Sequence, residues 1–296
     1  MMRKRSRLKK MTPGNAVILM LLTIFILMIV IPFINAITIS FITQDEYLSN
    51  RFALIPREPT VSAYQSIFRT DWLAQGYVNT ITIVTLAWAY CITICVLTAY
   101  ALTRQFPLKK LFYIYLIIPM FFGGGLIPTY LLLVGMGLKN TYGALILPAG
   151  VSTYYLMIMS TFFREIPESL TESARLDGAS EFRILRSIIL PLSTSVLATI
   201  SLFIVVGFWN EWFSAMIYLD KPRAWPLQLH LRSIINRAES QMMDKTNMSQ
   251  SRMTQKIYAE GVRMAAVMVT MLPIMLVYPF LQKYFVKGIM IGAVKG

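Results

Sequence analysis

Long apolar runs dominate the hydrophobic pattern of this chain. They lie at about 16–43, 76–103, 111–134, 143–163, 187–218 and 264–283. Each run approaches or exceeds the roughly 20 residues that a helix needs to cross a bilayer. The pattern therefore predicts an all-α, polytopic membrane protein with about six transmembrane helices.

Basic residues orient these spans. The opening MMRKRSRLKK carries positive charge just before the first run, which is too long for a signal peptide and lacks its small-residue cleavage site. More than half of the 28 Lys and Arg residues fall in the N-terminus, 104–110, 164–186 and the tail from Lys283. Because positive charge collects on the cytoplasmic side, both termini are predicted to be cytoplasmic.

This topology predicts the organisation of the chain. The predicted segments are a cytoplasmic basic N-terminus at 1–15, a first transmembrane helix at 16–43, an outer loop at 44–75, a transmembrane core at 76–283 and a cytoplasmic tail at 284–296. Within the core, a cytoplasmic loop is expected at about 164–191 and a second outer loop at about 219–263.

Helix breakers interrupt two of the spans. The third contains Pro119, Gly123 to Gly125 and Pro128, and the sixth contains Pro273 and Pro279. Proline removes a backbone donor and glycine weakens a helix, so both spans should kink or break. Broken backbone at membrane depth needs a protein or water-filled cavity around it, so the breaks indicate either a translocation path or simple bending in a packed bundle.

Composition excludes several chemistries. The net charge of +14 is explained by cytoplasmic loops, which leaves nucleic acid a poor partner. Cys91 and Cys95 lie four apart in one apolar run, as small packing residues do, and His230 is the only histidine, so no metal centre is expected. The sequence contains no GxxxxGK[ST] and no HExxH, so neither a nucleotide site nor an intramembrane metalloprotease is predicted.

A charged, helix-prone stretch lies between the fourth and fifth spans. Pro167 suits a first helical turn, Glu168 and Glu172 complement the N-terminal dipole, and Gly178 is a natural stop, which predicts a helix over about 167–177. Ser180 can cap a second helix.

Apolar residues continue this second helix toward the fifth span. Phe182, Leu185 and Ile189 recur at helical spacing before Pro191. The result is a cytoplasmic helix-turn-helix hairpin, which is either a solvated connection or a docking element.

The hairpin sequence ESARLDGASEFRILRSIILPL resembles the EAA loop of ATP-binding-cassette (ABC) importer permeases. The matching residues are Glu172, Ser173 and Ala174 at the opening, Asp177, Gly178 and Ala179 at the centre, and Ile189, Leu190 and Pro191 at the close. Ser173 replaces the usual alanine, and Ser195 stands where many members have proline; neither departure removes the docking role.

Three further segments extend the resemblance over roughly residues 76–296. LQKYFVKGIMIGAVKG and FWNEWFSAMIY are similar to the tail and fifth helix of carbohydrate permeases related to the smaller permease of the maltose transporter, and GGLIPTYLLLVGMGLKNTYGALILP is similar to the oligosaccharide branch.

The resemblance implies a permease subunit of the bacterial inner membrane that is not itself an enzyme. Its implied partners are a second permease, usually in a heterodimer, two copies of a cytoplasmic ATPase, a solute-binding protein and a sugar or oligosaccharide. No cofactor is expected on this chain, because ATP and Mg would bind the ATPase. The hairpin would then be a coupling helix whose movement switches the membrane helices between inward-facing and outward-facing states.

Coupling residues follow from the same resemblance. They are Glu172, Ser173, Ala174, Arg175, Leu176, Asp177, Gly178 and Ala179, with polar rim contacts from Glu172 and Arg175 and packing by Ala174 and Leu176. The tail, Gly292, Ala293, Val294, Lys295 and Gly296, either reaches between the ATPase subunits or is a frayed terminus.

The fifth span offers candidate solute-path residues, namely Trp209, Asn210, Glu211 and Trp212. A charge inside an apolar helix costs roughly 2.5 kcal/mol or more if unpaired. Glu211 therefore lies at the membrane edge, pairs with a partner subunit or lines the path. The tryptophans either stack on sugar rings or mark the membrane interface.

The second outer loop is rich in positive charge. Lys221, Arg223, Arg232 and Arg237 are candidate contacts for a solute-binding protein. Their charge suits an acidic oligosaccharide such as alginate, or equally an acidic docking protein. An ion-coupled secondary carrier is the alternative function.

Overall fold

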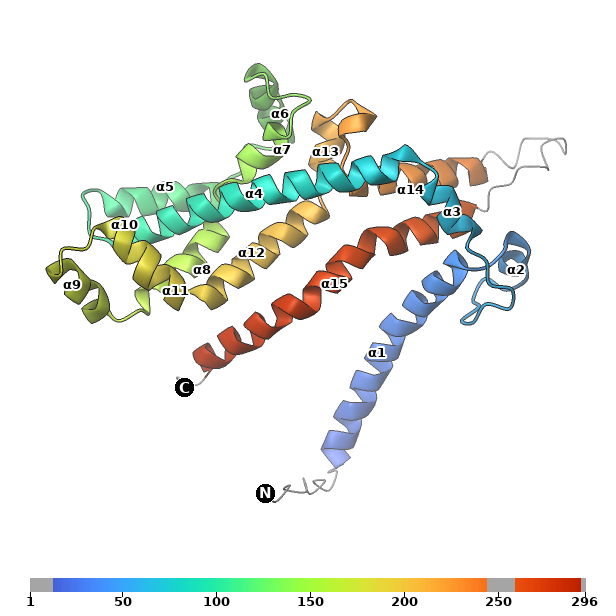
Figure 1. Ribbon diagram of the computed structural model, residues 1–296, viewed down its shortest axis with the longest axis horizontal. Coiled ribbons are helices and arrows are strands. Elements are labelled where there is room, and N and C mark those ends of the chain that lie inside the picture. Colours follow the sequence, from blue (N-terminus) through green and yellow to red (C-terminus); the bar gives the residue numbers. More distant parts are fainter. Residues whose placement is uncertain (1–12, 244–258, 294–296) are drawn as a thin grey trace. The chain divides into compact units, whose positions relative to one another are not determined.

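The computed structural model describes residues 13–243 and 259–293, and in these ranges it contains helices and connecting segments but no strand (Figure 1). Contacts divide the chain into two compact units. The first comprises residues 1–69 and 238–268, and the second comprises residues 70–237 and 269–296. The all-α fold is as predicted.

In the first unit, a long apolar helix is tied to the loop that follows it. Helix α1 (Pro13–Ser40) is exposed over most of its length, which suits a surrounding of lipid. At its end, the Asn35 amide nitrogen donates to the Ala53 carbonyl at 2.9 Å, and the Thr38 hydroxyl donates to the Leu54 carbonyl at 2.9 Å. The loop also contains two short helices, α2 (Gln44–Ser49) and α3 (Ser62–Phe68).

The second unit is built on helix α4 (Asp71–Thr103), which lies alongside α8 (Thr153–Arg164) and α12 (Thr194–Trp209) (Figure 1). Their shared core includes Ala99 and Met159, both fully buried. Cys91 and Cys95 are buried free thiols in the same core. This confirms their prediction as small packing residues.

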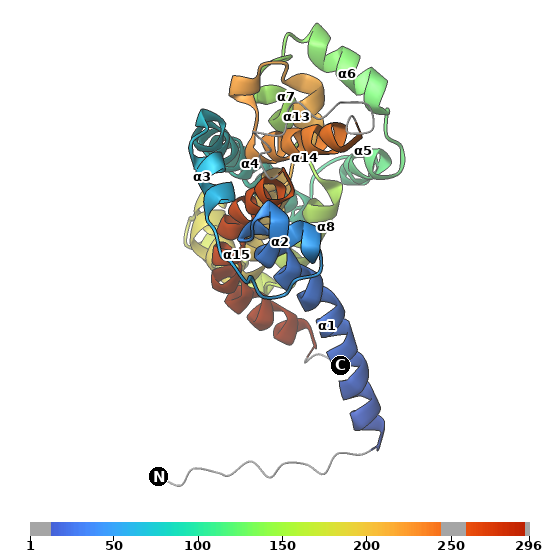
Figure 2. The same cartoon turned by 90° about the vertical axis from the view of Figure 1, so that its right-hand side faces the viewer.

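Three pairs of neighbouring apolar helices are bent at a short break between them. Helices α5 (Lys109–Phe121) and α6 (Leu126–Gly135) form the first pair, which is bent by 114°. The second pair joins Gly143–Ala149, which contains α7 (Gly143–Ile146), to α8 and is bent by 46°. The third pair joins Glu181–Leu192, which contains α10 (Glu181–Ile184) and α11 (Leu190–Leu192), to α12 and is bent by 84°. Figure 2 shows α6 turned away from α5. The break predicted in the third span is confirmed, with Gly125 at a φ of +85°. The other two breaks were not predicted.

The sixth span is one continuous helix, α15 (Ala259–Ala293), which runs through both Pro273 and Pro279. Of the predicted kink or break, the break is therefore absent, and a kink stays a prediction. Pro273 cannot donate to the carbonyl four residues earlier, that of Val269. The Tyr77 hydroxyl donates to that carbonyl at 2.6 Å instead. A partner from α4 thus satisfies the acceptor that the proline leaves free.

In the described ranges, three helices are long and apolar enough to cross a membrane, or up to six if each bent pair forms one span. The upper number agrees with the six predicted spans. No membrane side follows from these helices alone, so the cytoplasmic location of both termini stays a prediction.

Candidate coupling and transport sites

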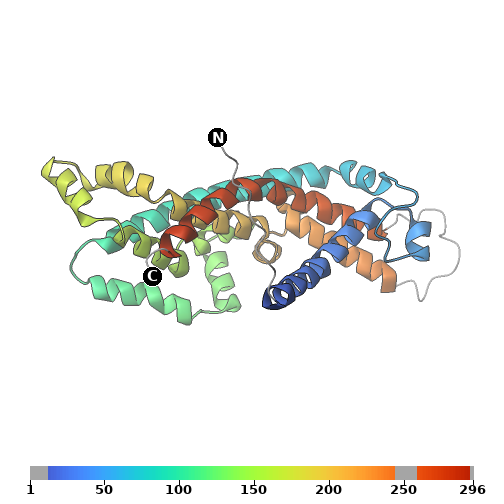
Figure 3. The same cartoon turned by 90° about the horizontal axis from the view of Figure 1, so that it is seen from below.

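The coupling hairpin begins with helix α9 (Glu168–Leu176), which projects at one end of the second unit (Figures 1 and 3). Pro167 precedes its first turn and Glu168 lies within it, as the sequence predicted. The Thr171 hydroxyl donates to the Glu168 carbonyl at 2.9 Å. These features confirm the predicted start and length of the helix.

The turn after α9 depends on Gly178. This residue has a φ of +76°, and its N–H donates to the Arg175 carbonyl at 2.9 Å. The Ala179 N–H donates to the Ala174 carbonyl at 2.9 Å, which completes a Schellman motif. Ser180 then accepts from the Arg183 N–H and caps α10, as predicted. The glycine therefore sets the angle between the two arms of the hairpin.

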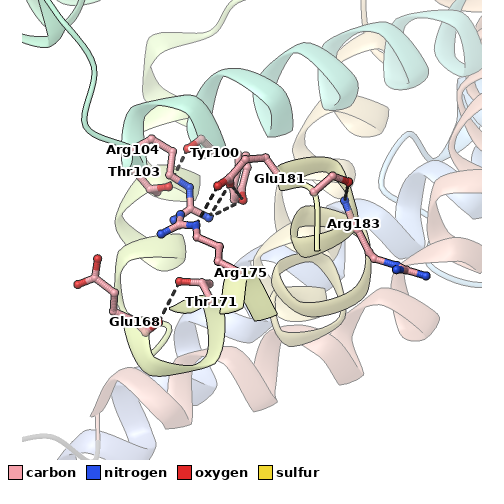
Figure 4. A network of polar contacts seen from close by, with 9 residues as sticks. Tyr100, Thr103, Arg104, Glu168, Thr171, Arg175, Glu181 and Arg183 are labelled. Atoms are coloured by element: carbon pink, nitrogen blue, oxygen red, sulfur yellow. Dashed lines mark hydrogen bonds and ion pairs between the residues drawn. The ribbon is translucent and has the colours of Figure 1, made fainter. Parts of the chain in front are cut away.

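A polar network joins the hairpin to the end of α4, and Glu181 lies at its centre (Figure 4). The Tyr100 hydroxyl donates to Glu181 Oε2 at 2.5 Å, and Arg104 Nη2 lies 3.2 Å from the same oxygen. On the other side, Arg175 Nε donates to Glu181 Oε1 at 2.9 Å. Arg104 also donates to the Tyr100 hydroxyl. One carboxylate thus links α4, α9 and α10.

The face of α9 away from this network is open. Leu176 is 90% exposed, and Glu172, Ser173, Asp177 and Gly178 are exposed with it. Ala174 and Ala179 instead pack against the core of the second unit. Both Ala174 and Leu176 were predicted to pack against another protein. Leu176 is free to do so, whereas Ala174 is half-buried within this chain.

The C-terminal tail is only partly described. Gly292 and Ala293 complete helix α15, so the helix extends beyond the span predicted to end at residue 283. Val294, Lys295 and Gly296 lie outside the described residues. Insertion of this tail between ATPase subunits stays a prediction.

The four candidate path residues lie in different surroundings. Trp209 is buried and its indole N–H donates to the Thr270 carbonyl at 3.2 Å. The Asn210 amide nitrogen donates to the Val206 carbonyl at 2.9 Å. The Trp212 ring lies 5.0 Å from the Arg232 guanidinium. These contacts connect three of the four residues to neighbouring parts of the fold.

Glu211 differs because it lines a cavity of about 520 Å³. Its Oε1 accepts from the Ser214 N–H at 2.7 Å, at the start of helix α13 (Phe213–Tyr218). The cavity is also lined by residues of α4, α6, α8 and α12. It therefore lies within the second unit, among the helices that are predicted to cross the membrane.

The segment after α13 is anchored to α4. The Asn79 amide nitrogen donates to the carbonyls of Arg223 at 2.8 Å and Trp225 at 2.9 Å. The Thr80 hydroxyl accepts from the Leu227 N–H at 2.8 Å, where helix α14 (Leu227–Met243) begins. Both side chains are buried. The start of the segment predicted to form the second outer loop is thus held against α4.

The side chains of Lys221, Arg223 and Arg232 are exposed on this part of the chain, and Arg237 lies within α14. Next to them, Lys139 Nζ lies 3.0 Å from Asp220 Oδ2. The Lys139 ammonium and then the Asn140 amide, which donates to the same oxygen, hold the pKa of Asp220 below its usual value. Asp220 in turn raises the pKa of Lys139.

Sequence reasoning missed the residues that position these sites. Tyr100, Arg104 and Glu181 give no local pattern, because they come together only when α4 meets the hairpin. Two polar residues inside an apolar run, Asn79 and Thr80, were the available signal that the segment after α13 is anchored to α4. No group of three or more His, Cys, Asp or Glu side chains in the described ranges could hold a metal ion.

These features define a class of protein: a multi-pass membrane protein with a water-exposed hairpin and bent spans around a cavity. The chain belongs to the family of binding-protein-dependent transport system inner membrane components, whose model matches residues 92–291. It is therefore a membrane component of such a transport system.

Similarity to individual proteins extends over nearly the whole chain. The chain is 37% identical over 276 residues to the polygalacturonan/rhamnogalacturonan transport system permease protein YtcP of Bacillus subtilis, which covers 93% of this chain and 96% of YtcP. A permease relative of similar length thus exists at substantial identity.

Solved structures share the fold. One is a bacterial ABC transporter involved in the import of the acidic polysaccharide alginate, with a TM-score of 0.82, 27% identity, and coverage of 93% of this chain and 99% of that one. Another, a bacterial alginate ABC transporter in complex with an alginate pentasaccharide-bound periplasmic protein, matches with a TM-score of 0.61 and 13% identity over 90% of this chain and 92% of that one. The second likeness concerns the fold alone.

Proposed function

We propose that this chain forms half of the translocation path of an ATP-driven importer of sugars or oligosaccharides in the bacterial inner membrane. A second permease would complete the path, two copies of a cytoplasmic ATPase would drive it, and a solute-binding protein would deliver the sugar. Both chain termini would face the cytoplasm. The observation that carries this proposal is the exposed α9 hairpin, fixed to α4 through Glu181.

The surface of the hairpin supports docking to an ATPase. Leu176 is 90% exposed and Phe182 is 68% exposed, although both belong to a segment rich in charge and predicted to lie in water. Both side chains belong to the hairpin that would face the ATPase, and exposed apolar surface is available for burial at a protein interface. Burying such side chains against a partner would contribute roughly 1.5–3 kcal/mol each.

The network around Glu181 supports transmission of movement. A force on α9 passes through Arg175 and Glu181 to Tyr100 and Arg104 at the end of α4. Because α4 packs along α8 and α12, a shift of the hairpin would move these helices together. ATP-driven closure of two ATPases would thereby switch the path between inward-facing and outward-facing states.

The substrate class is supported by relatives. YtcP is named for polygalacturonan and rhamnogalacturonan, and the solved transporter at 27% identity imports alginate. Exposed Lys221, Arg223 and Arg232 would attract an acidic oligosaccharide or the acidic surface of its binding protein. We therefore propose an oligosaccharide, with acidic plant or algal polysaccharide fragments as the leading candidates.

Docking is tested by purifying the tagged chain from its native membrane in mild detergent and identifying stoichiometric partners by mass spectrometry. A Leu176→Asp variant should lose the ATPase and keep the second permease. The matched control is Ile55→Asp, which changes a residue that is 81% exposed in the predicted outer loop; this variant should retain both partners. A wild-type chain that purifies without any ATPase would overturn the proposal and favour an ion-coupled carrier.

A further inference from the structure

Three interruptions of the helices meet at the cavity that Glu211 lines. Its walls include Leu126, where α6 begins after the first break, Ser152 in the break before α8, and Glu211 in the break between α12 and α13. Backbone outside a helix is tolerated at membrane depth where it lines a water-filled cavity or is covered by protein. Convergence of three breaks on one space indicates a built, hydrated cavity rather than a packing gap.

The size of this cavity suits a small ligand. Its volume of about 520 Å³ falls within the roughly 300–1,000 Å³ that is typical of ligand pockets. A Cβ built on Gly207, in the wall formed by α12, would meet nothing within 4 Å. The space therefore extends directly to the backbone of α12.

The polar side of the cavity is a hydrogen-bond acceptor. Glu211 Oε1 accepts from the Ser214 N–H at 2.7 Å, which fixes the orientation of the carboxylate. An ionised carboxylate has about four lone-pair sites, so it can accept further hydrogen bonds. In the described part of the chain, no Lys or Arg lines this cavity. Hydroxyl groups are therefore favoured as ligands, and carboxylates are not.

Part of the cavity lining is aromatic. The rings of Tyr155 and Phe203 are stacked, with centroids 6.0 Å apart and an angle of 16° between their planes. Both line the cavity, and Phe203 is 38% exposed. A sugar ring has an apolar C–H face and a rim of hydroxyls, so it matches a site with an aromatic wall and an anionic acceptor.

We propose that this cavity is a subsite for one uncharged sugar unit, whose hydroxyls donate to Glu211 while its C–H face packs on the aromatic wall. The proposal rests on the proposed function, because the sugar must enter from the transport path. It adds a selectivity: the subsite accepts a neutral unit of an oligosaccharide and disfavours a unit that carries a carboxylate.

The first test fills the cavity. The complex is reconstituted in liposomes, and uptake of trigalacturonic acid and of its methyl-esterified, uncharged form is measured together with ATP hydrolysis. Gly207→Leu should lower uptake of the ester at least tenfold, because the new side chain occupies the subsite. The α12 helix should be retained, since leucine is a better helix former than glycine. The control is Gly135→Leu, at a site outside the cavity that also has nothing within 4 Å of an added Cβ.

The second test changes only the charge. Glu211→Gln keeps an oxygen that can accept from Ser214, so α13 should remain capped, but the negative charge is lost. The ratio of ester to acid uptake should fall at least fivefold, because the acceptor weakens for hydroxyls and no longer repels a carboxylate.

Several outcomes would overturn the subsite. These are wild-type uptake of neither trisaccharide, uptake by Gly207→Leu at the wild-type rate, equal loss in the Gly135→Leu control, or an unchanged ester-to-acid ratio in Glu211→Gln. Reduced native lipid in purified Gly207→Leu with normal uptake would assign the space to an acyl chain. In each case, the rate of ATP hydrolysis and the binding of the ATPase to this chain are measured independently, and they test the proposed function separately from the subsite.

Discussion

The coupling hairpin and the helices around Trp209 are held together in different ways. The hairpin is fixed by a half-exposed carboxylate that bonds Tyr100, Arg104 and Arg175. Around Trp209, this buried indole and the half-buried Tyr77 donate instead to backbone carbonyls of α15. Exposed ion pairs contribute little stability, whereas buried packing contributes much. Substitutions in the hairpin should therefore affect the coupling of ATP hydrolysis to transport, whereas substitutions near Trp209 should affect the stability of the fold.

The largest expected effect is on the buried side. Trp209→Ala removes a buried ring and leaves the Thr270 carbonyl without its indole donor, so the free energy of unfolding should fall by about 3–5 kcal/mol. Thermal unfolding of the detergent-solubilised complex measures this loss. Unchanged thermal stability would show that the ring contributes little to packing and would reopen a direct role in the solute path.

Gly178→Ala should have the next largest effect. A Cβ at this site meets nothing within 4 Å, so the cost arises from the φ of +76° alone and should be about 1 kcal/mol. Transport should fall because the hairpin angle changes. Gly135→Ala is the control, since its glycine lies in helix α6, outside the cavity lining, and also has open space. Normal transport by Gly178→Ala would contradict the role of the turn.

Glu181→Gln should barely change stability, by about 1 kcal/mol or less, because the carboxylate is half-exposed. Its expected effect is on coupling: fewer sugars transported per ATP hydrolysed, while the ATPase stays bound. The control is Glu168→Gln, an exposed carboxylate on the same hairpin whose side chain lies outside the Glu181 network. An unchanged ratio of transport to hydrolysis would remove Glu181 from the path of movement.

The smallest effect concerns pH at Asp220. Its pKa is lowered in the folded protein, first by the hydrogen bond from Lys139. The stabilising contribution is therefore present above the ordinary pKa of aspartate and is lost as pH falls through the lower, folded value. Thermal unfolding of wild type and Asp220→Asn should differ slightly near neutral pH and converge in acid. A difference that persists in strong acid would contradict this account.

The predictable parts of this molecule were those with local causes. Apolar runs predicted the spans, Pro167 and Gly178 predicted the limits of α9, and the glycines at 123–125 predicted a break. Pro273 does not break its helix, and the carbonyl that it leaves without a donor is bonded by Tyr77, about 200 positions earlier in the chain, which no local pattern predicts. Glu181 and the cavity were likewise out of reach, since each depends on which helices meet.

The most direct test of the central claim is sugar uptake by the reconstituted complex with its binding protein outside the liposomes. ATP is supplied inside and no ion gradient is present. The account predicts uptake that depends on internal ATP and is abolished by Leu176→Asp but retained by Ile55→Asp. Uptake driven by a proton or sodium gradient without ATP would contradict it.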